Sequence, residues 1–167
     1  MTRKSGFMVV DVGIRLARRC LRENSSTTLG AFLAQLVPEL EDDREVLKDV
    51  ARAIGGRPSA LKEAMAAVGE WAGGLKPNGR VLGYSDLSRV WELEALEAGT
   101  DSRRGFWRLL GKLARANPAL QGYDFERLED RARDHHEELE RHRLRAAEAA
   151  FGPPRRSVGS AASARAR

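Results

Sequence analysis

A long segment near the end of the chain, residues 125–151, constrains the fold most strongly. Its small and apolar residues recur at intervals of three, four or seven positions, the spacing that places side chains on one face of an α-helix. These residues are Phe125, Leu128, Ala132, Leu139, Ala146 and Ala150. Asp124 can cap the start of this helix, and Pro153 and Pro154 stop it. Two pairs of opposite charge, four residues apart, predict ion pairs on its outer face: Glu129–Arg133 and Glu137–Arg141.

Five further segments carry the same helical spacing. We expect helices at about 9–23, 29–54, 58–75, 85–99 and 102–116. Pro38 lies within the second of them, where a kink or a break into two helices is expected. No stretch shows a convincing strand pattern. The sequence therefore predicts an all-α fold, an antiparallel four-helix-type bundle with kinked or broken helices.

The segment 85–99 has the clearest boundaries of the five. Ser85 can cap its start, and Gly99 is expected to end it. Three polar residues can then cap the next helix: Thr100, Asp101 and Ser102. That next helix is expected to place five side chains in the core: Phe106, Trp107, Leu109, Leu110 and Leu113.

Composition and charge limit the classes of function. Of the 167 residues, 42% are hydrophobic and 32% are charged, which is typical of one soluble domain, here 9–151. The net charge of +5 belongs to a flexible N-terminus, 1–8, and a disordered basic tail, 152–167, because the body between them holds 23 basic and 24 acidic residues. Nucleic acid is therefore expected to bind only through the tail, if at all.

No membrane span is expected, because no run of eighteen apolar residues occurs. A secretory signal is not expected either, because Asp11 and Arg15 interrupt the apolar stretch near the N-terminus. Cys20 is the only cysteine, so no internal disulfide can form. We expect its side chain to be a small buried apolar group. A cytoplasmic protein fits these features best.

Glu94 is the acid most strongly expected to point inward. At 100° per residue it falls within an apolar arc of the segment 85–99 that also contains Leu87, Val90, Trp91 and Ala98. A buried carboxylate must be paired, metal-bound or protonated. Two interpretations stay open, a metal ligand or proton donor, and an internal ion pair with an arginine such as Arg44 or Arg108.

An acidic run in the segment 29–54 supplies the second candidate ligand. A solvated face explains most of this run, but Glu39 or Asp43 lies close enough to the apolar stripe to point inward. Three histidines flank the stripe of the last helix: His135, His136 and His142. None has a glutamate three residues before it, so the Glu-x-x-His pattern of two-metal bundles is missing and surface or interface histidines are expected.

Catalysis finds no support in the sequence. No nucleophile motif, Cys/His constellation or phosphate-binding loop occurs. Three tryptophans are spread over three expected helices and are interpreted as core or interface anchors: Trp71, Trp91 and Trp107. An enzyme is therefore less expected than a protein without catalytic activity.

Three stretches carry a resemblance to a known group of proteins. They are Leu-Gly-Ala-Phe-Leu-Ala-Gln-Leu at 29–36, Leu-Lys-Pro-Asn-Gly-Arg-Val-Leu-Gly-Tyr-Ser-Asp-Leu-Ser-Arg-Val-Trp-Glu-Leu-Glu-Ala-Leu at 75–96, and Gly-Phe-Trp-Arg-Leu-Leu at 105–110. With them the chain resembles uncharacterised bacterial proteins that have a ferritin-like helical bundle. The resemblance implies a four-helix core, and relatives elsewhere in that superfamily bind two metals. Only Glu94 and Glu39 match as inward acids, and the N-terminal segment looks shorter than in the group.

Three functions follow as expectations. The first is a non-catalytic helical bundle that acts through protein contacts, with a partner or another copy of itself, or in a stress-related role. The second is a ferritin-like protein that binds iron or manganese through Glu94 and Glu39. The third is weak nucleic-acid binding through the arginine-rich tail.

Overall fold

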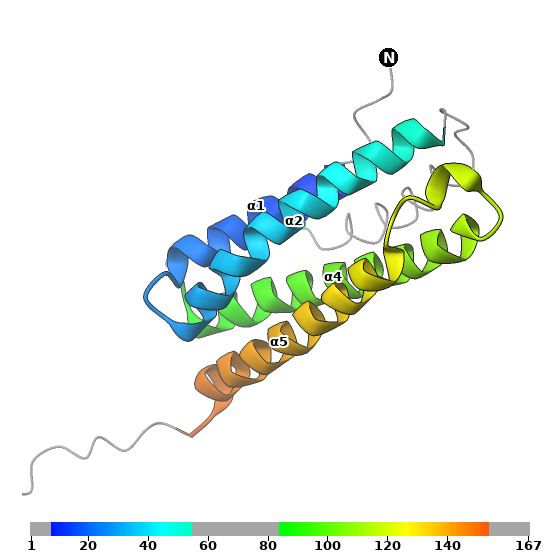
Figure 1. Ribbon diagram of the computed structural model, residues 1–167. Helices are drawn as coiled ribbons and strands as arrows, with labels where there is room; N and C mark the ends of the chain where they lie inside the picture. The colour runs from blue at the N-terminus through cyan, green and yellow to red at the C-terminus, as the bar shows by residue number, and fades with distance from the viewer. Residues whose placement is uncertain (1–7, 55–83, 154–167) are drawn as a thin grey trace, which may run out of the picture.

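The computed structural model of the protein describes residues 8–54 and 84–153, and both stretches are helical (Figure 1). Four α-helices and one short 3-10 helix make up most of them: α1 (Met8–Glu23), α2 (Thr28–Ala53), α4 (Asp86–Ala114), η1 (Pro118–Leu120) and α5 (Phe125–Phe151). Neither stretch contains a strand, so the predicted all-α class is confirmed for the described residues. The helix predicted at 58–75 lies outside them, as do residues 1–7 and 154–167 of the two predicted tails.

Short polar side chains begin three of these helices. Thr27 Oγ1 accepts a hydrogen bond from the backbone N–H of Gly30 at 3.1 Å, and Ser85 Oγ accepts one from Ser88 at 3.1 Å. Asp124 Oδ1 accepts the third, from the backbone N–H of Arg127 at 3.0 Å. Each cap satisfies a backbone donor that the helix itself leaves free. The predicted caps at Ser85 and Asp124 are confirmed.

The predicted break at Pro38 does not occur, because α2 runs without interruption from Thr28 to Ala53. Proline removes only its own N–H bond to the preceding turn. Buried residues on both sides of Pro38, including Leu33, Leu36 and Leu47, continue one stripe and pack the whole helix against its neighbours. The other form of the prediction, a kink at Pro38, stays a prediction.

The predicted helix end at Gly99 is wrong, because α4 continues through it to Ala114. The helix caps predicted just after it are therefore wrong as well. Thr100 is buried in the bundle, and Ser102 donates its hydroxyl to the carbonyl of Ala98 at 3.1 Å, a bond within the helix. A glycine inside a helix costs about 1 kcal/mol relative to alanine. Burial of residues beyond it, such as Trp107, offsets that cost.

Five ion pairs and one contact between a carboxylate and an imidazole show the direction in which each helix runs relative to its neighbours. In an antiparallel pair, residue numbers rise along one helix as they fall along the other. Six contacts follow this rule: Asp11–Arg44 and Arg18–Glu41 join α1 and α2, Glu39–His135 and Asp43–Arg131 join α2 and α5, and Glu94–Arg143 and Arg108–Glu129 join α4 and α5. It follows that α2 and α4 are parallel. Figure 1 shows the last turn of α2 and the first turn of α4 at opposite ends of the bundle.

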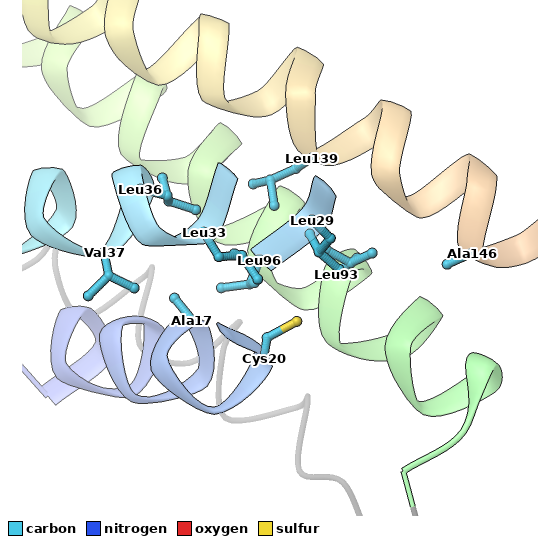
Figure 2. Close-up of a cluster of buried hydrophobic side chains, with 10 residues drawn as sticks. All are labelled: Ala17, Cys20, Leu29, Leu33, Leu36, Val37, Leu93, Leu96, Leu139 and Ala146. Carbon is cyan, nitrogen blue, oxygen red and sulfur yellow. The ribbon is translucent and has the colours of Figure 1, made fainter. Parts of the chain in front are cut away.

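Two apolar clusters form the interior. The first, shown in Figure 2, draws residues from all four helices: Ala17, Cys20, Leu29, Leu33, Leu36, Val37, Leu93, Leu96, Leu139 and Ala146. The second lies toward the other end of the bundle: Leu47, Val50, Trp107, Leu110, Leu120, Phe125 and Ala132. In the second cluster the ring of Phe125 stacks on Trp107 and on Tyr123. Among the described residues, no helix is long and apolar enough to cross a membrane.

Two glycines with opposite environments give a test of this packing. A Cβ atom on Gly30 would lie 2.1 Å from the backbone oxygen of Asn24, so Gly30→Ala forces the turn between α1 and α2 to move. A Cβ atom on Gly99 would meet nothing within 4 Å. We expect Gly30→Ala to lower the free energy of unfolding by about 1–3 kcal/mol, and Gly99→Ala to raise it by about 0.5–1 kcal/mol.

Urea denaturation of the two variants measures both effects. Gly99→Ala also tests the continuous α4. If the helix ended at this residue, as the sequence predicts, an alanine there would replace the residue that favours a helix end and would destabilise the protein.

Candidate functional site: a buried ionic cluster

An ionic cluster lies inside the bundle, between the two apolar clusters. Its centre is Asp43 of α2, a residue that is 2% exposed. Its Oδ1 atom accepts a hydrogen bond from Arg131 Nη2 of α5, and its Oδ2 atom lies 3.2 Å from Arg103 Nη1 of α4. One carboxylate therefore joins three helices. Ion pairs of this kind stabilise a fold only when most of their polar atoms find partners, because desolvation of the charges is costly.

His135 of α5 extends the cluster. Arg103 Nη2 lies 2.8 Å from His135 Nδ1, and His135 Nε2 contacts Glu39 Oε2 of α2. A guanidinium has only donors, so Nδ1 must accept and cannot carry a proton. The proton of the neutral imidazole is then on Nε2, and this N–H group donates a hydrogen bond to the Glu39 carboxylate. Since the lone pair on Nδ1 is occupied by Arg103, His135 has no free basic nitrogen in this arrangement.

The charges of the cluster balance. Two carboxylates, Glu39 and Asp43, face two guanidiniums, Arg103 and Arg131, around a neutral imidazole. Burial raises the pKa of Asp43 above its ordinary value, although both arginines act in the opposite direction. Burial also lowers the pKa of His135 to about 4, and the charge of Arg103 adds to this effect while Glu39 opposes it. Both shifts have burial as their largest cause.

Glu94, the leading candidate from the sequence, does not point inward. Its side chain is 48% exposed and pairs with Arg143 Nη1 of α5 at 3.2 Å, so the expected partners Arg44 and Arg108 are also wrong. The apolar arc that contains Glu94 is an outer face of α4, where Trp91 is 64% exposed. The buried glutamate of this helix is Glu92. Because α4 has two apolar faces, the periodicity alone could not show which one faces the core.

Glu39, the second candidate, does contact a possible ligand, His135. Asp43, the alternative within the same acidic run, is the more buried of the two acids. Across residues 8–54 and 84–153, no group of three or more histidine, cysteine, aspartate or glutamate side chains is placed to hold a metal ion. A metal held by Glu94 and Glu39 stays a prediction.

The sequence predicts surface or interface histidines, and a surface position is wrong for two of the three. His135 and His142 are both buried, and the ring of Phe32 from α2 stacks on His142 and meets His135 edge-on. A signal for this was present in the sequence. Both histidines continue the three- and four-residue spacing of the core stripe of α5: Ala132, His135, Leu139, His142 and Ala146. The ion pairs predicted on its outer face also differ, since Glu129 pairs with Arg108, and Arg141 pairs with Glu138.

A second polar cluster joins the end of α1 to the start of α4. Asn24 is buried, donates from Nδ2 to Tyr84 Oη at 2.7 Å, and accepts at Oδ1 from Arg89 Nε at 2.7 Å. Cys20 is buried beside it, as the sequence predicts, with Sγ 3.7 Å from Tyr84 Oη. Burial raises the pKa of the Cys20 thiol to about 11, and nearby Glu92 adds to the shift. This thiol therefore stays protonated at neutral pH, which fits a structural role.

Acidification gives a test of the buried histidines. The pKa of His135 is about 4 in the folded protein, below the ordinary value of 6.5, and that of His142 is also lowered by burial. The unfolded chain therefore binds protons first as the pH falls below about 6.5, and stability is lost progressively toward pH 4. We expect a loss on the order of 1–2 kcal/mol between pH 7 and pH 5, since one pKa unit corresponds to about 1.4 kcal/mol.

Urea denaturation at the two pH values measures this loss. The double variant His135→Gln, His142→Gln should show a clearly smaller difference between pH 7 and pH 5. An unchanged difference in that variant would mean that other groups are responsible.

Comparison of the chain with models of protein families, with curated proteins and with solved structures gives no match.

Proposed function

We propose that this chain is a non-catalytic helical-bundle protein that acts through protein contacts. The observation that carries the proposal is the outer face of α4. Four large apolar side chains are exposed on this helix although its opposite face is already buried in the bundle: Leu87, Trp91, Leu109 and Leu113. Scattered exposed apolar residues are common, but a row of them on one helix face marks an interaction surface.

The interior supports the same proposal. In the buried ionic cluster, each carboxylate and the imidazole already have partners within the chain, and the guanidinium of Arg103 lies between Asp43 and His135. A positively charged guanidinium beside Asp43 opposes the binding of a metal ion there. The cluster is therefore suited to joining α2, α4 and α5. This is the structural role of an internal ion pair, the alternative to a metal site in the sequence analysis.

The order of the helices supports a ferritin-like arrangement as part of the proposal. In that arrangement, two antiparallel pairs are joined by one long connection, which makes the second and third bundle helices parallel. The parallel directions of α2 and α4 and the antiparallel pairs α1–α2 and α4–α5 fit this scheme. We propose that the bundle keeps a ferritin-like scaffold and replaces the central metals with arginine ion pairs.

Metal analysis of the protein, purified without chelators and then loaded with iron or manganese, tests the proposal. We expect no stoichiometric metal to remain after gel filtration. Stoichiometric binding would overturn the non-catalytic assignment. It would favour the second candidate, an iron- or manganese-binding protein.

One contact favours that second candidate, the pairing of a carboxylate and an imidazole from facing helices, Glu39 and His135. If this pair holds a metal, Glu39→Ala and His135→Ala must both abolish binding. Glu41→Ala, which removes an exposed acid of the same helix that pairs with Arg18, serves as the control and must leave metal binding unchanged.

A further inference from the structure

The exposed apolar residues of α4 belong to one continuous stripe. We define the outer stripe as eight residues that recur every three or four positions: Leu87, Trp91, Ala95, Ala98, Ser102, Gly105, Leu109 and Leu113. At 100° per residue they fall within an arc of about 80°. The buried residues of α4, such as Leu93, Leu96 and Trp107, lie on the opposite side of the helix. The outer stripe is about 39 Å long at 1.5 Å per residue.

The order of side-chain sizes along the outer stripe is symmetric about Thr100. Large side chains stand at both ends and small ones in the middle. If a second copy of α4 lies antiparallel with its Thr100 at the same level, large residues face large ones and small residues face small ones. The opposed pairs are then Leu87 with Leu113, Trp91 with Leu109, Ala95 with Gly105, and Ala98 with Ser102. Small residues at the crossing point let two helix axes approach to about 8 Å, the close end of the usual range.

Charges beside the outer stripe favour the same direction. One flank is acidic in the first half of α4 and basic in the second: Asp86, Glu94, Glu97 and Asp101, followed by Arg104, Arg108, Lys112 and Arg115. An antiparallel two-fold partner places this flank of both copies on the same side of the interface, with the acidic half of one against the basic half of the other. In a parallel two-fold pair the two charged flanks lie on opposite sides of the interface and do not meet. Three of these residues pair with α5 within the chain: Glu94, Glu97 and Arg108. The side chains of Glu94 and Arg108 remain 48% and 54% exposed, so a second copy can still reach them, whereas that of Glu97 is only 13% exposed. Asp101 and Arg104 pair with each other at the surface of α4.

From these two patterns we propose that the outer stripe of α4 docks antiparallel on the outer stripe of a second copy, forming a two-fold symmetric dimer. The inference rests on the proposed function, action through protein contacts, and names the partner. A two-fold axis requires a surface that is complementary to itself, and both the size pattern and the charge pattern of α4 have this property. One helix pair of this length is at the small end of specific interfaces, below about 1,200 Å² in total, so we expect a reversible dimer.

Sedimentation of the full chain over a wide range of concentrations tests the association. We expect the chain to shift from monomer to dimer as the concentration rises. Trp91→Glu should abolish this shift, because it places a charged carboxylate against the apolar Leu109 of the second copy. The control is Leu144→Glu, which changes an exposed leucine of α5 and should leave the dimer intact. A chain that is monomeric at every concentration, or whose association survives Trp91→Glu, would overturn the proposal.

Crosslinking tests the direction of the pair. A short bifunctional maleimide should join Leu87→Cys to Leu113→Cys when the two single variants are mixed, because these positions oppose each other. Neither variant alone should crosslink, because equivalent positions are about 39 Å apart in the antiparallel pair. Crosslinking of each variant with itself would indicate a parallel pair and would overturn the proposal. The native thiol of Cys20 is buried and does not compete.

The two proposals fail in different ways. If the chain is monomeric and binds no metal, the proposed dimer is wrong, and the proposed function then requires a different protein partner. If the chain binds stoichiometric iron or manganese, the proposed non-catalytic function is wrong, whatever the oligomeric state.

Discussion

Replacing Asp43 by alanine should lower the free energy of unfolding by about 3–5 kcal/mol, the usual cost of removing one partner from a buried ion pair. The cost arises because Arg103 and Arg131 lose the carboxylate that both contact, and Arg103 stays buried with an uncompensated charge. Urea denaturation at neutral pH measures the change. An additional loss of α2–α5 contacts should appear as faster amide exchange in the middle of both helices.

The adjacent residue supplies the control for this prediction. Asp42 is exposed on the same turn of α2, so Asp42→Ala should change stability by less than about 0.5 kcal/mol. If the two alanine variants behaved alike, the ionic cluster would not hold the three helices together. Replacing Asp43 by asparagine keeps the shape of the side chain and removes its charge, so a comparable loss in that variant would assign the effect to charge.

Replacing Trp107 by alanine should cost about 3–5 kcal/mol, because the large cavity left in the second apolar cluster cannot close completely. Trp107 is fully buried, at 0% exposure, and stacks on Phe125 of α5. Its indole Nε1 has no hydrogen-bond partner among the described residues. Trp107→Phe should therefore cost much less, since it keeps the stacking and removes a buried donor that has no partner.

The matched control lies on the same helix. Trp91 is 64% exposed, so Trp91→Ala should leave the stability of the monomer within about 0.5 kcal/mol of the parent. Denaturation at low protein concentration keeps this comparison free of self-association. A large loss in Trp91→Ala under these conditions would contradict the outward position of the outer stripe.

Local chemistry accounts for the parts of the fold that could be predicted from the sequence. The starts of α4 after Ser85 and of α5 after Asp124 follow from capping side chains, which act within one turn. The core stripe of α2 follows from its spacing, because Leu33, Leu36 and Val50 are buried as that spacing predicts. These features depend only on residues within one helix and its cap, so they can be predicted without knowing how the helices pack.

Predictions that required a choice between two faces or two ends were less successful. Gly99 has the chemistry of a helix end, yet α4 continues because the residues after it are buried. The sequence predicts an inward Glu94 because Leu87 and Trp91 lie on its face of the helix, but both of these residues are exposed. A helix with two apolar faces gives the same periodicity whichever face turns inward, and only the neighbouring helices settle that choice.

The candidate site shows the same limit. The sequence pointed to Glu39 or Asp43 as an inward acid of α2, and both belong to the ionic cluster. The pattern does not indicate that Arg103 would be buried or that Arg131 would reach into the cluster, because an arginine is ordinarily a surface residue. Both positions depend on Asp43, which is 88 residues away from Arg131 along the chain.

The sequence by itself determined the helical class, the starts of α4 and α5 and the apolar stripes, because these depend on side chains within one or two turns of each other. Only the tertiary structure decided which face of α4 is buried, which residues carry the central charges and which histidines lie inside. The physical reason is that the burial of a charged or apolar group depends on what packs against it. Asp43 and His135 are buried because they contact residues of helices that are far away along the chain. Trp91 is exposed because no helix in the described part of the chain covers its side of α4.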